Sequence, residues 1–171
     1  NGCPWCYARK IYSRFGKSFE PTFHTEKLDE QIKLKKPSRI FAGSVTDFWS
    51  DGVQMVWREE VFESMNCPQH RFFVLTKNPH KIDYSEIDCF DKNIFLGVSI
   101  TNQKDMWREE TLARTISIRF RPFISFEPLL GPIDLPGIFD VDWVIIGGLT
   151  GCKGKTNPDW VKYLLNQIPK E

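Results

Sequence analysis

Five short, nearly continuous apolar runs constrain the fold more than any other feature of this 171-residue sequence. Runs of this kind are buried on both faces, which is typical of parallel strands covered by helices. Strands and helices that alternate along a chain form either an open doubly wound sheet or a closed or partial barrel. The predicted strands span residues 39–45, 71–76, 93–100, 118–126 and 143–147.

The segments between these runs carry helix signals. Apolar residues recur near helical spacing between Asp51 and Met65. Asn157 and Pro158 predict the start of a last helix that runs to Ile168. Two further helices are predicted over residues 8–15 and 102–114, with a helical turn at 26–33.

Composition excludes several classes of protein. No apolar run is long enough to span a bilayer, and the net charge of +1 gives no field that would favour nucleic acid or an anionic membrane. The five cysteines are odd in number and irregular in spacing, which is a poor disulfide framework. We therefore expect a cytoplasmic protein with no membrane partner.

Polar residues follow the predicted strands. In parallel α/β folds the functional site lies at the carboxyl ends of the strands. Polar strand ends also occur simply because loops begin there. Glu127 stands in an otherwise apolar stretch, so we expect its carboxylate to be desolvated and to need a partner or ligand. Lys77 is a candidate for binding an anion, and Gly147 and Gly148 allow a ligand to approach the backbone closely.

Cys3 and Cys6 form a C-x-x-C loop near the start of the chain. Two intervening residues let the backbone turn and aim both sulfurs at one centre. The spacing alone suits zinc, an iron–sulfur cluster or a redox dithiol. A zinc-stabilised binding module would add His24 as a ligand, whereas a thioredoxin-like dithiol fits poorly because five strands are too many for that fold.

The segment Cys3-Pro-Trp-Cys6-Tyr-Ala8 resembles the end of the cysteine loop of radical S-adenosylmethionine (SAM) enzymes. More closely, the chain resembles a phage-associated family of radical-SAM-like proteins of uncharacterised function. The resemblance runs nearly end to end in the same order. Its matching stretches are residues 6–8, 23–29, 36–41, 44–48, 75–77, 96–99, 125–133, 142–148 and 158–161.

This resemblance implies a partial (β/α)6 TIM-like barrel with mainly parallel strands, as a single domain over residues 1–171 that lacks its first strand and is truncated at one or both ends. It also implies a [4Fe-4S] cluster with Cys3 and Cys6 as metal ligands. Such clusters use three cysteines of the loop, so the remaining ligand would precede Asn1 or be Cys152. A scaffold that keeps the fold without a cluster is the other alternative.

The resemblance further implies that SAM binds the open iron and is cleaved to a 5′-deoxyadenosyl radical, with electrons from an external donor. Glu127 would lie near the sulfonium or the ribose, and Glu127 and Lys77 are the candidate catalytic residues. The substrate is unknown, and nucleic acid is unsupported by the net charge. The implied contacts with SAM are Tyr7 near the adenine, Ser44 at the methionine end, Ser99 and Asn102 at the ribose, and Gly147 and Gly148 at the adenine.

Overall fold

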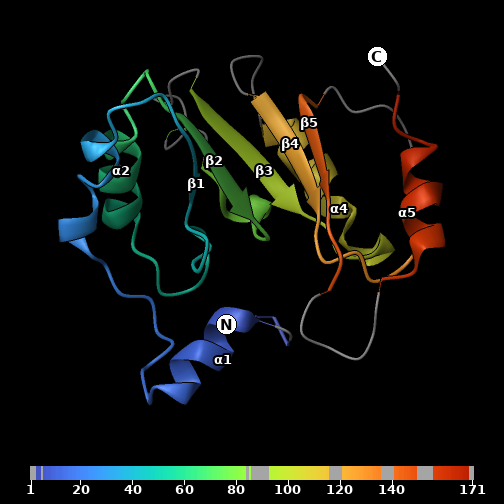
Figure 1. Ribbon diagram of the computed structural model, residues 1–171, viewed down its shortest axis with the longest axis horizontal. Helices are drawn as coiled ribbons and strands as arrows, with labels where there is room; N and C mark the ends of the chain where they lie inside the picture. Colours follow the sequence, from blue (N-terminus) through green and yellow to red (C-terminus); the bar gives the residue numbers. More distant parts are fainter. Residues whose placement is uncertain are drawn as a thin grey trace.

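Parallel strands pair in chain order and curl into a half-barrel in the computed structural model (Figure 1). The structure describes residues 3–4, 6–83, 85, 93–115, 121–135, 141–149 and 156–169. Within these residues the sheet has five strands in the order β1-β2-β3-β4-β5, and every neighbouring pair is parallel. The strands are β1 (Arg39–Ala42), β2 (Arg71–Thr76), β3 (Ile94–Ser99), β4 (Arg121–Phe126) and β5 (Trp143–Ile146).

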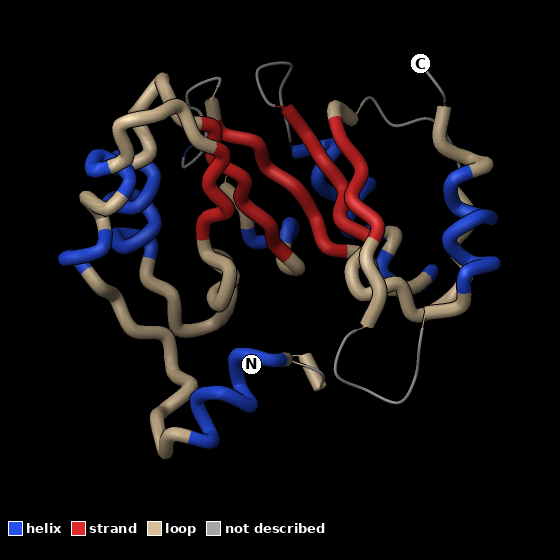
Figure 2. Tube along the Cα trace, in the orientation of Figure 1, coloured by secondary structure: helices blue, strands red, loops and turns tan. Residues whose placement is uncertain are grey.

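Helices cover one face of this sheet, as Figure 2 shows by the blue segments around the red strands. The main core lies on this face, because alternate strand residues pack there against Phe62, Leu112 and Leu164, one from each of three helices. The strand residues in this core include Phe72, Val74, Leu96, Val98, Ile124 and Phe126. The three helices are α2 (Met55–Ser64), α4 (Trp107–Thr115) and α5 (Pro158–Leu165).

The opposite, inner face of the half-barrel carries a second, aromatic cluster of Phe73, Phe95 and Phe123. Phe73 stacks on Phe95 with ring centroids 4.7 Å apart and meets Phe123 edge-on. Gly97 lies in register with Phe123, and a Cβ atom at position 97 would lie 2.6 Å from the Phe123 ring. Because Gly97 has no side chain, the Phe123 ring can occupy this position in the aromatic cluster.

The structure confirms the α/β class and the parallel sheet, and each described strand falls within a predicted run. The expected helices are present as α1 (Tyr7–Arg14), α2, α4 and α5. The predicted turn at 26–33 consists of the 3-10 segments η1 (Thr25–Lys27) and η2 (Gln31–Lys33). Among the described residues, no helix combines the length and apolar character needed to cross a bilayer.

Candidate functional site

The carboxyl ends of the strands share one edge of the half-barrel, since all the strands are parallel. Helix α1 lies on this side of the sheet, below the strands in Figure 1. Tyr7, the first residue of α1, donates a hydrogen bond from Oη to the backbone oxygen of Ser44, 3.3 Å away. Because Ser44 follows β1, this contact joins the cysteine loop to the carboxyl edge of the sheet.

The cysteine loop ends at the amino terminus of α1. The backbone N–H of Cys6 donates to the carbonyl of Cys3 at 2.9 Å, which closes the turn between the two residues. The Sγ atom of Cys6 accepts a hydrogen bond from the backbone N–H of Arg9 at 3.4 Å and so caps the helix. Both cysteines are free thiols and half-buried. A helix amino terminus favours negative charge, which suits a thiolate ligand.

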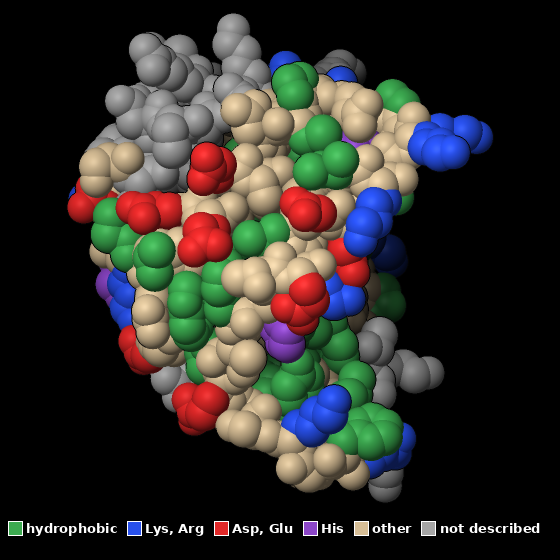
Figure 3. Space-filling view, turned by 90° about the vertical axis from the view of Figure 1, so that its left-hand side faces the viewer, with side chains coloured by type: hydrophobic (Ala, Val, Ile, Leu, Met, Phe, Trp, Pro, Cys, Tyr) green, Lys and Arg blue, Asp and Glu red, His purple; other side chains and the backbone are tan. Residues whose placement is uncertain are grey.

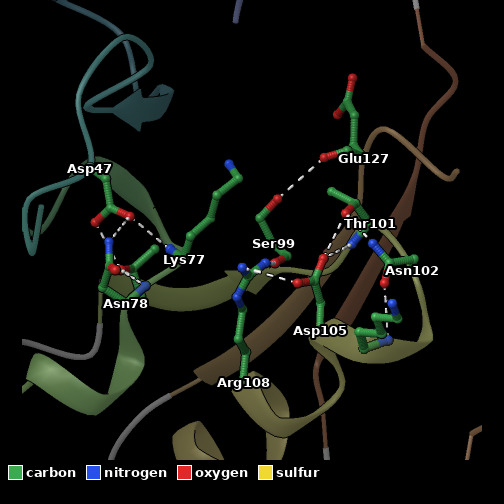
Figure 4. Close-up of polar contacts among 11 residues, drawn as sticks. Asp47, Lys77, Asn78, Ser99, Thr101, Asn102, Asp105, Arg108 and Glu127 are labelled. Atoms are coloured by element: carbon green, nitrogen blue, oxygen red, sulfur yellow. Dashed lines mark hydrogen bonds and ion pairs between the residues drawn. The ribbon is translucent and has the colours of Figure 1, made fainter. Parts of the chain in front are cut away.

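Asp47 joins the ends of β1 and β2 (Figure 4). Its Oδ1 accepts hydrogen bonds from Thr76 Oγ1 at 2.8 Å and from the backbone N–H of Trp49 at 3.0 Å. Its Oδ2 accepts from the backbone N–H of Lys77 at 2.8 Å and from Asn78 Nδ2 at 3.0 Å. This carboxylate is therefore fully occupied, and its role is to fix the backbone from which Lys77 projects.

The Lys77 side chain is half-buried and extends away from Asp47 in Figure 4. In the part of the chain that the structure describes, no hydrogen bond or ion pair engages its ammonium group. Ionised ammonium groups bind anions through up to three N–H donors. Lys77 lies at this edge, and its role in binding an anion stays a prediction.

Glu127 directly follows β4, and the expectation that its carboxylate is desolvated is wrong, because the residue is exposed. The apolar residues around it in the sequence point into the core, whereas the turn at 127 leaves the sheet. The buried Ser99 donates from Oγ to the backbone oxygen of Glu127 at 3.2 Å. On the other side, a Cβ atom at Gly147 would lie 2.7 Å from Cδ of Glu127. Glu127 thus occupies space that Gly147 leaves open.

Asn102 uses both ends of its amide within the loop after β3. Its Oδ1 accepts from the backbone N–H of Lys104 at 3.0 Å, and its Nδ2 donates to Thr101 Oγ1 at 3.1 Å. Gly148 lies beside Thr156, whose Oγ1 would be 3.2 Å from a Cβ at position 148. Both residues lie at the carboxyl edge as expected, and their contacts shape the loops there.

A half-buried ion pair supports the end of β3, and only a three-residue charge spacing hints at it in the sequence. Arg108 Nη2 lies 3.0 Å from Asp105 Oδ1, and the two side chains are 16% and 15% exposed. Arg108 Nη1 also donates to the backbone oxygen of Ser99 at 2.8 Å. Asp105 Oδ2 accepts from both the backbone N–H and the hydroxyl of Thr101. This network fixes the strand end that carries Ser99.

The structure therefore brings the sequence-predicted site residues to one edge of the half-barrel. Asp47 and Arg108 are the positioning residues that sequence reasoning missed. No cluster of three or more His, Cys, Asp or Glu side chains suited to a metal is found within the described ranges. Cys152, the internal candidate for a further cluster ligand, lies outside the described residues. Tyr7 links the loop of Cys3 and Cys6 to this edge through its hydrogen bond to Ser44. The predicted residues that follow the strands at this edge are Ser44, Lys77, Ser99, Asn102, Glu127, Gly147 and Gly148.

Fold and site together define an α/β half-barrel protein with a polar site at the carboxyl edge of its parallel strands. The chain matches the model of a family described as "Protein of unknown function (DUF5131)" over residues 1–171, and it belongs to that family. The comparisons with curated proteins and with solved structures gave no match.

Proposed function

We propose that the chain is a radical SAM-type enzyme domain of the (β/α)6 class, which binds a [4Fe-4S] cluster and SAM at the carboxyl edge. The hydrogen bond from Tyr7 to the backbone of Ser44 carries this proposal. It joins the C-x-x-C loop to the edge where Lys77, Glu127 and Gly147 lie. An isolated zinc loop would bind its metal without contacting that edge. A cofactor that is held at one end by a cluster would contact both the C-x-x-C loop and the edge.

The residues that are present fit such a cluster. Cys3 and Cys6 are free thiols in a closed turn, and the amino terminus of α1 favours the negative charge of thiolate ligands. The remaining ligand would be a cysteine upstream of Asn1 or Cys152. When bound, the cluster would supply the electron for reductive cleavage of SAM to the 5′-deoxyadenosyl radical.

The side chains at the edge would bind and orient SAM. The exposed carboxylate of Glu127 would attract the sulfonium cation, and the exposed backbone at Gly148 would admit the adenine. Ser99 Oγ donates to the backbone oxygen of Glu127, and it retains lone pairs that can accept from a ribose hydroxyl. Asn102 Oδ1 has the same capacity beside its bond from Lys104.

Lys77 is not among the residues that would bind the cluster or SAM, so it is available to bind the substrate. Its backbone is fixed by Asp47, while its ammonium extends away from Asp47 and has no partner among the described residues. We assign it to an anionic group of the substrate, which it would hold close to the reacting end of SAM. Tyr7 and Ser44 would flank the cofactor where the cysteine loop meets β1.

The test is reconstitution of the full-length protein with iron and sulfide without oxygen. We expect a brown protein whose EPR spectrum changes when SAM is added, and formation of 5′-deoxyadenosine after addition of dithionite. Cys6→Ala should abolish the cluster signal. Cys67→Ala, at a half-buried thiol that packs against the main core, should keep it. A colourless protein that retains zinc would identify a zinc-binding module, and one that retains no metal would identify a scaffold without a cluster.

A further inference from the structure

Three strands begin with an arginine on the inner face of the half-barrel. Arg39 opens β1 and Arg71 opens β2, and these two residues are register partners. Arg121 opens β4 and is the register partner of Phe95. Since the strands are parallel, all three arginines lie at the amino edge, opposite the candidate site. We call Arg39, Arg71 and Arg121 the arginine row.

The arginine row carries positive charge without internal compensation. All three side chains are exposed. Within the described residues no ion pair to a carboxylate engages any of them. Side chains of register partners project from neighbouring strands about 5 Å apart, so Arg39 and Arg71 repel each other. An anion bound between them would remove this repulsion.

Aromatic rings lie next to the arginine row on the same face. The guanidinium of Arg121 lies over the Phe95 ring, 5.6 Å from its centroid. Phe41, two residues after Arg39, is 50% exposed, and Trp143 on β5 is 42% exposed although it packs on Phe73. These exposed rings lie on the same face as the positive charge, where nucleic-acid bases could stack on them.

The charge of this region differs from that of its surroundings. Figure 3 shows Lys and Arg side chains toward the upper right of the view, the side that faces the reader in Figure 1, while acidic side chains occupy mostly the left and centre. Lys35 and Lys36 precede β1 and are also exposed. The net charge of +1 for the chain therefore conceals a local excess of positive charge among the described residues of this region.

We propose that the arginine row and the neighbouring rings of Phe41 and Trp143 form a binding site for single-stranded nucleic acid. Proteins that bind single strands combine a positive groove that follows the phosphates with aromatic side chains on which bases stack. Arginine pairs with phosphate through two parallel N–H donors. The inner face offers both groups side by side, and its concave form admits a single strand more readily than a rigid duplex.

The alternative occupant is an acidic peptide. Its carboxylates would satisfy the arginines equally well, but they give no reason for two large exposed rings. The stacking surface therefore favours nucleic acid. This site is independent of the proposed radical SAM chemistry, because it lies at the opposite edge and uses none of the same residues.

Fluorescence anisotropy tests the proposal with labelled 15-mers of dT and rU, a 15-base-pair DNA duplex and a 15-mer of glutamate. We expect the single strands to bind more tightly than the duplex and the peptide, and affinity to fall as salt rises from 50 to 200 mM. The difference between dT and rU identifies whether DNA or RNA is preferred. Equal or tighter binding of the peptide or the duplex, or no binding of either single strand, would overturn the proposal.

Variants locate the site. Arg39→Gln/Arg71→Gln should weaken binding of the single strand at least 10-fold and reduce the slope of log K against log salt by about 1.4, as expected for two lost phosphate contacts. Arg14→Gln/Lys17→Gln removes the same charge from exposed positions around the end of α1, and should leave the affinity within 2-fold. Phe41→Leu should weaken binding about 5-fold or more with an unchanged salt slope. Equal losses in the two double variants would show non-specific attraction and refute the site.

Discussion

Gly147 and Glu127 share one space at the carboxyl edge: a Cβ atom at position 147 would lie 2.7 Å from Cδ of the glutamate. Gly147→Ala should therefore displace the exposed Glu127 side chain without much effect on the fold. We expect the free energy of unfolding to change by less than about 1 kcal/mol, because an exposed side chain can rotate away. Under the proposed function, the affinity for SAM should fall several-fold.

A double variant separates this mechanism from a direct effect of the added methyl group. If Gly147→Ala acts through Glu127, then adding it to Glu127→Ala should cause no further loss of SAM affinity. Additive losses measured by equilibrium dialysis would contradict the arrangement described above.

Asp47 holds the ends of β1 and β2 together through its four accepted hydrogen bonds. Asp47→Ala leaves the hydroxyl of Thr76, which is 1% exposed, without this partner. We expect a loss of about 2–3 kcal/mol in urea denaturation, because unsatisfied buried donors are costly. Asp51→Ala is the control: its exposed pair with Lys81 should contribute less than about 1 kcal/mol. Similar losses in both variants would show that Asp47 has no special role.

Gly97→Ala tests the packing of the inner face. The added Cβ would lie 2.6 Å from both the ring and the backbone oxygen of Phe123, and the backbone oxygen cannot move aside easily. We expect destabilisation of about 1–3 kcal/mol from overpacking, seen as a lower urea midpoint. Gly131→Ala places its methyl group in open space and should be nearly neutral. A neutral Gly97→Ala would mean that the aromatic cluster tolerates a looser arrangement.

Glu109 makes stability depend on pH. Burial, with a smaller contribution from Glu110, raises the pKa of this carboxyl from 4.5 to about 7. Its Oε2 atom has no hydrogen-bond partner within the described residues. Between pH 4.5 and 7 the folded protein keeps a proton that the unfolded chain releases, so stability falls as pH rises through this window. The total loss is about 3 kcal/mol, from 1.36 kcal/mol per pKa unit.

Urea denaturation at pH 5 and pH 8 measures this effect. Glu109→Gln should be more stable than the wild type at pH 8 and should show a weaker pH dependence. Glu110→Gln, at the exposed neighbouring position, should retain most of the dependence. Identical pH profiles for the wild type and Glu109→Gln would exclude Glu109 as the cause.

The strands could be predicted from the sequence because burial on both faces leaves a continuous apolar signal. Runs such as residues 71–76 and 94–99 lie within the predicted bounds. Sequence also placed the polar strand ends at one edge, since parallel strands leave no other arrangement. It could not tell how each polar side chain is used. Glu127 looked buried because its neighbours are apolar, but the chain turns out of the sheet after Phe126.

Asp47 and Arg108 were missed for a different reason. The partners of Asp47 include residues at the end of β2, and no local pattern reveals such contacts. Asp105 lies only three positions before Arg108, but that spacing does not show that the pair is half-buried or that Arg108 also donates to the backbone of Ser99. Asp47 follows a strand like many loop residues do, and its bonds to Thr76 and Lys77 span about thirty positions along the chain. The arginine row could not be predicted either. Its three residues are far apart in the sequence, and the strand register is needed to show that they share one face.

The order of the sheet is also the order of synthesis. Among the described strands, each from β2 to β5 pairs with the strand that precedes it in the chain, so none of them has to insert between two that are already paired. As the polypeptide leaves the ribosome, each new strand and its covering helix can pack against a strand that has already emerged. Assembly can therefore advance from the amino end one unit at a time, and the strand edge that receives the next strand moves forward as translation proceeds.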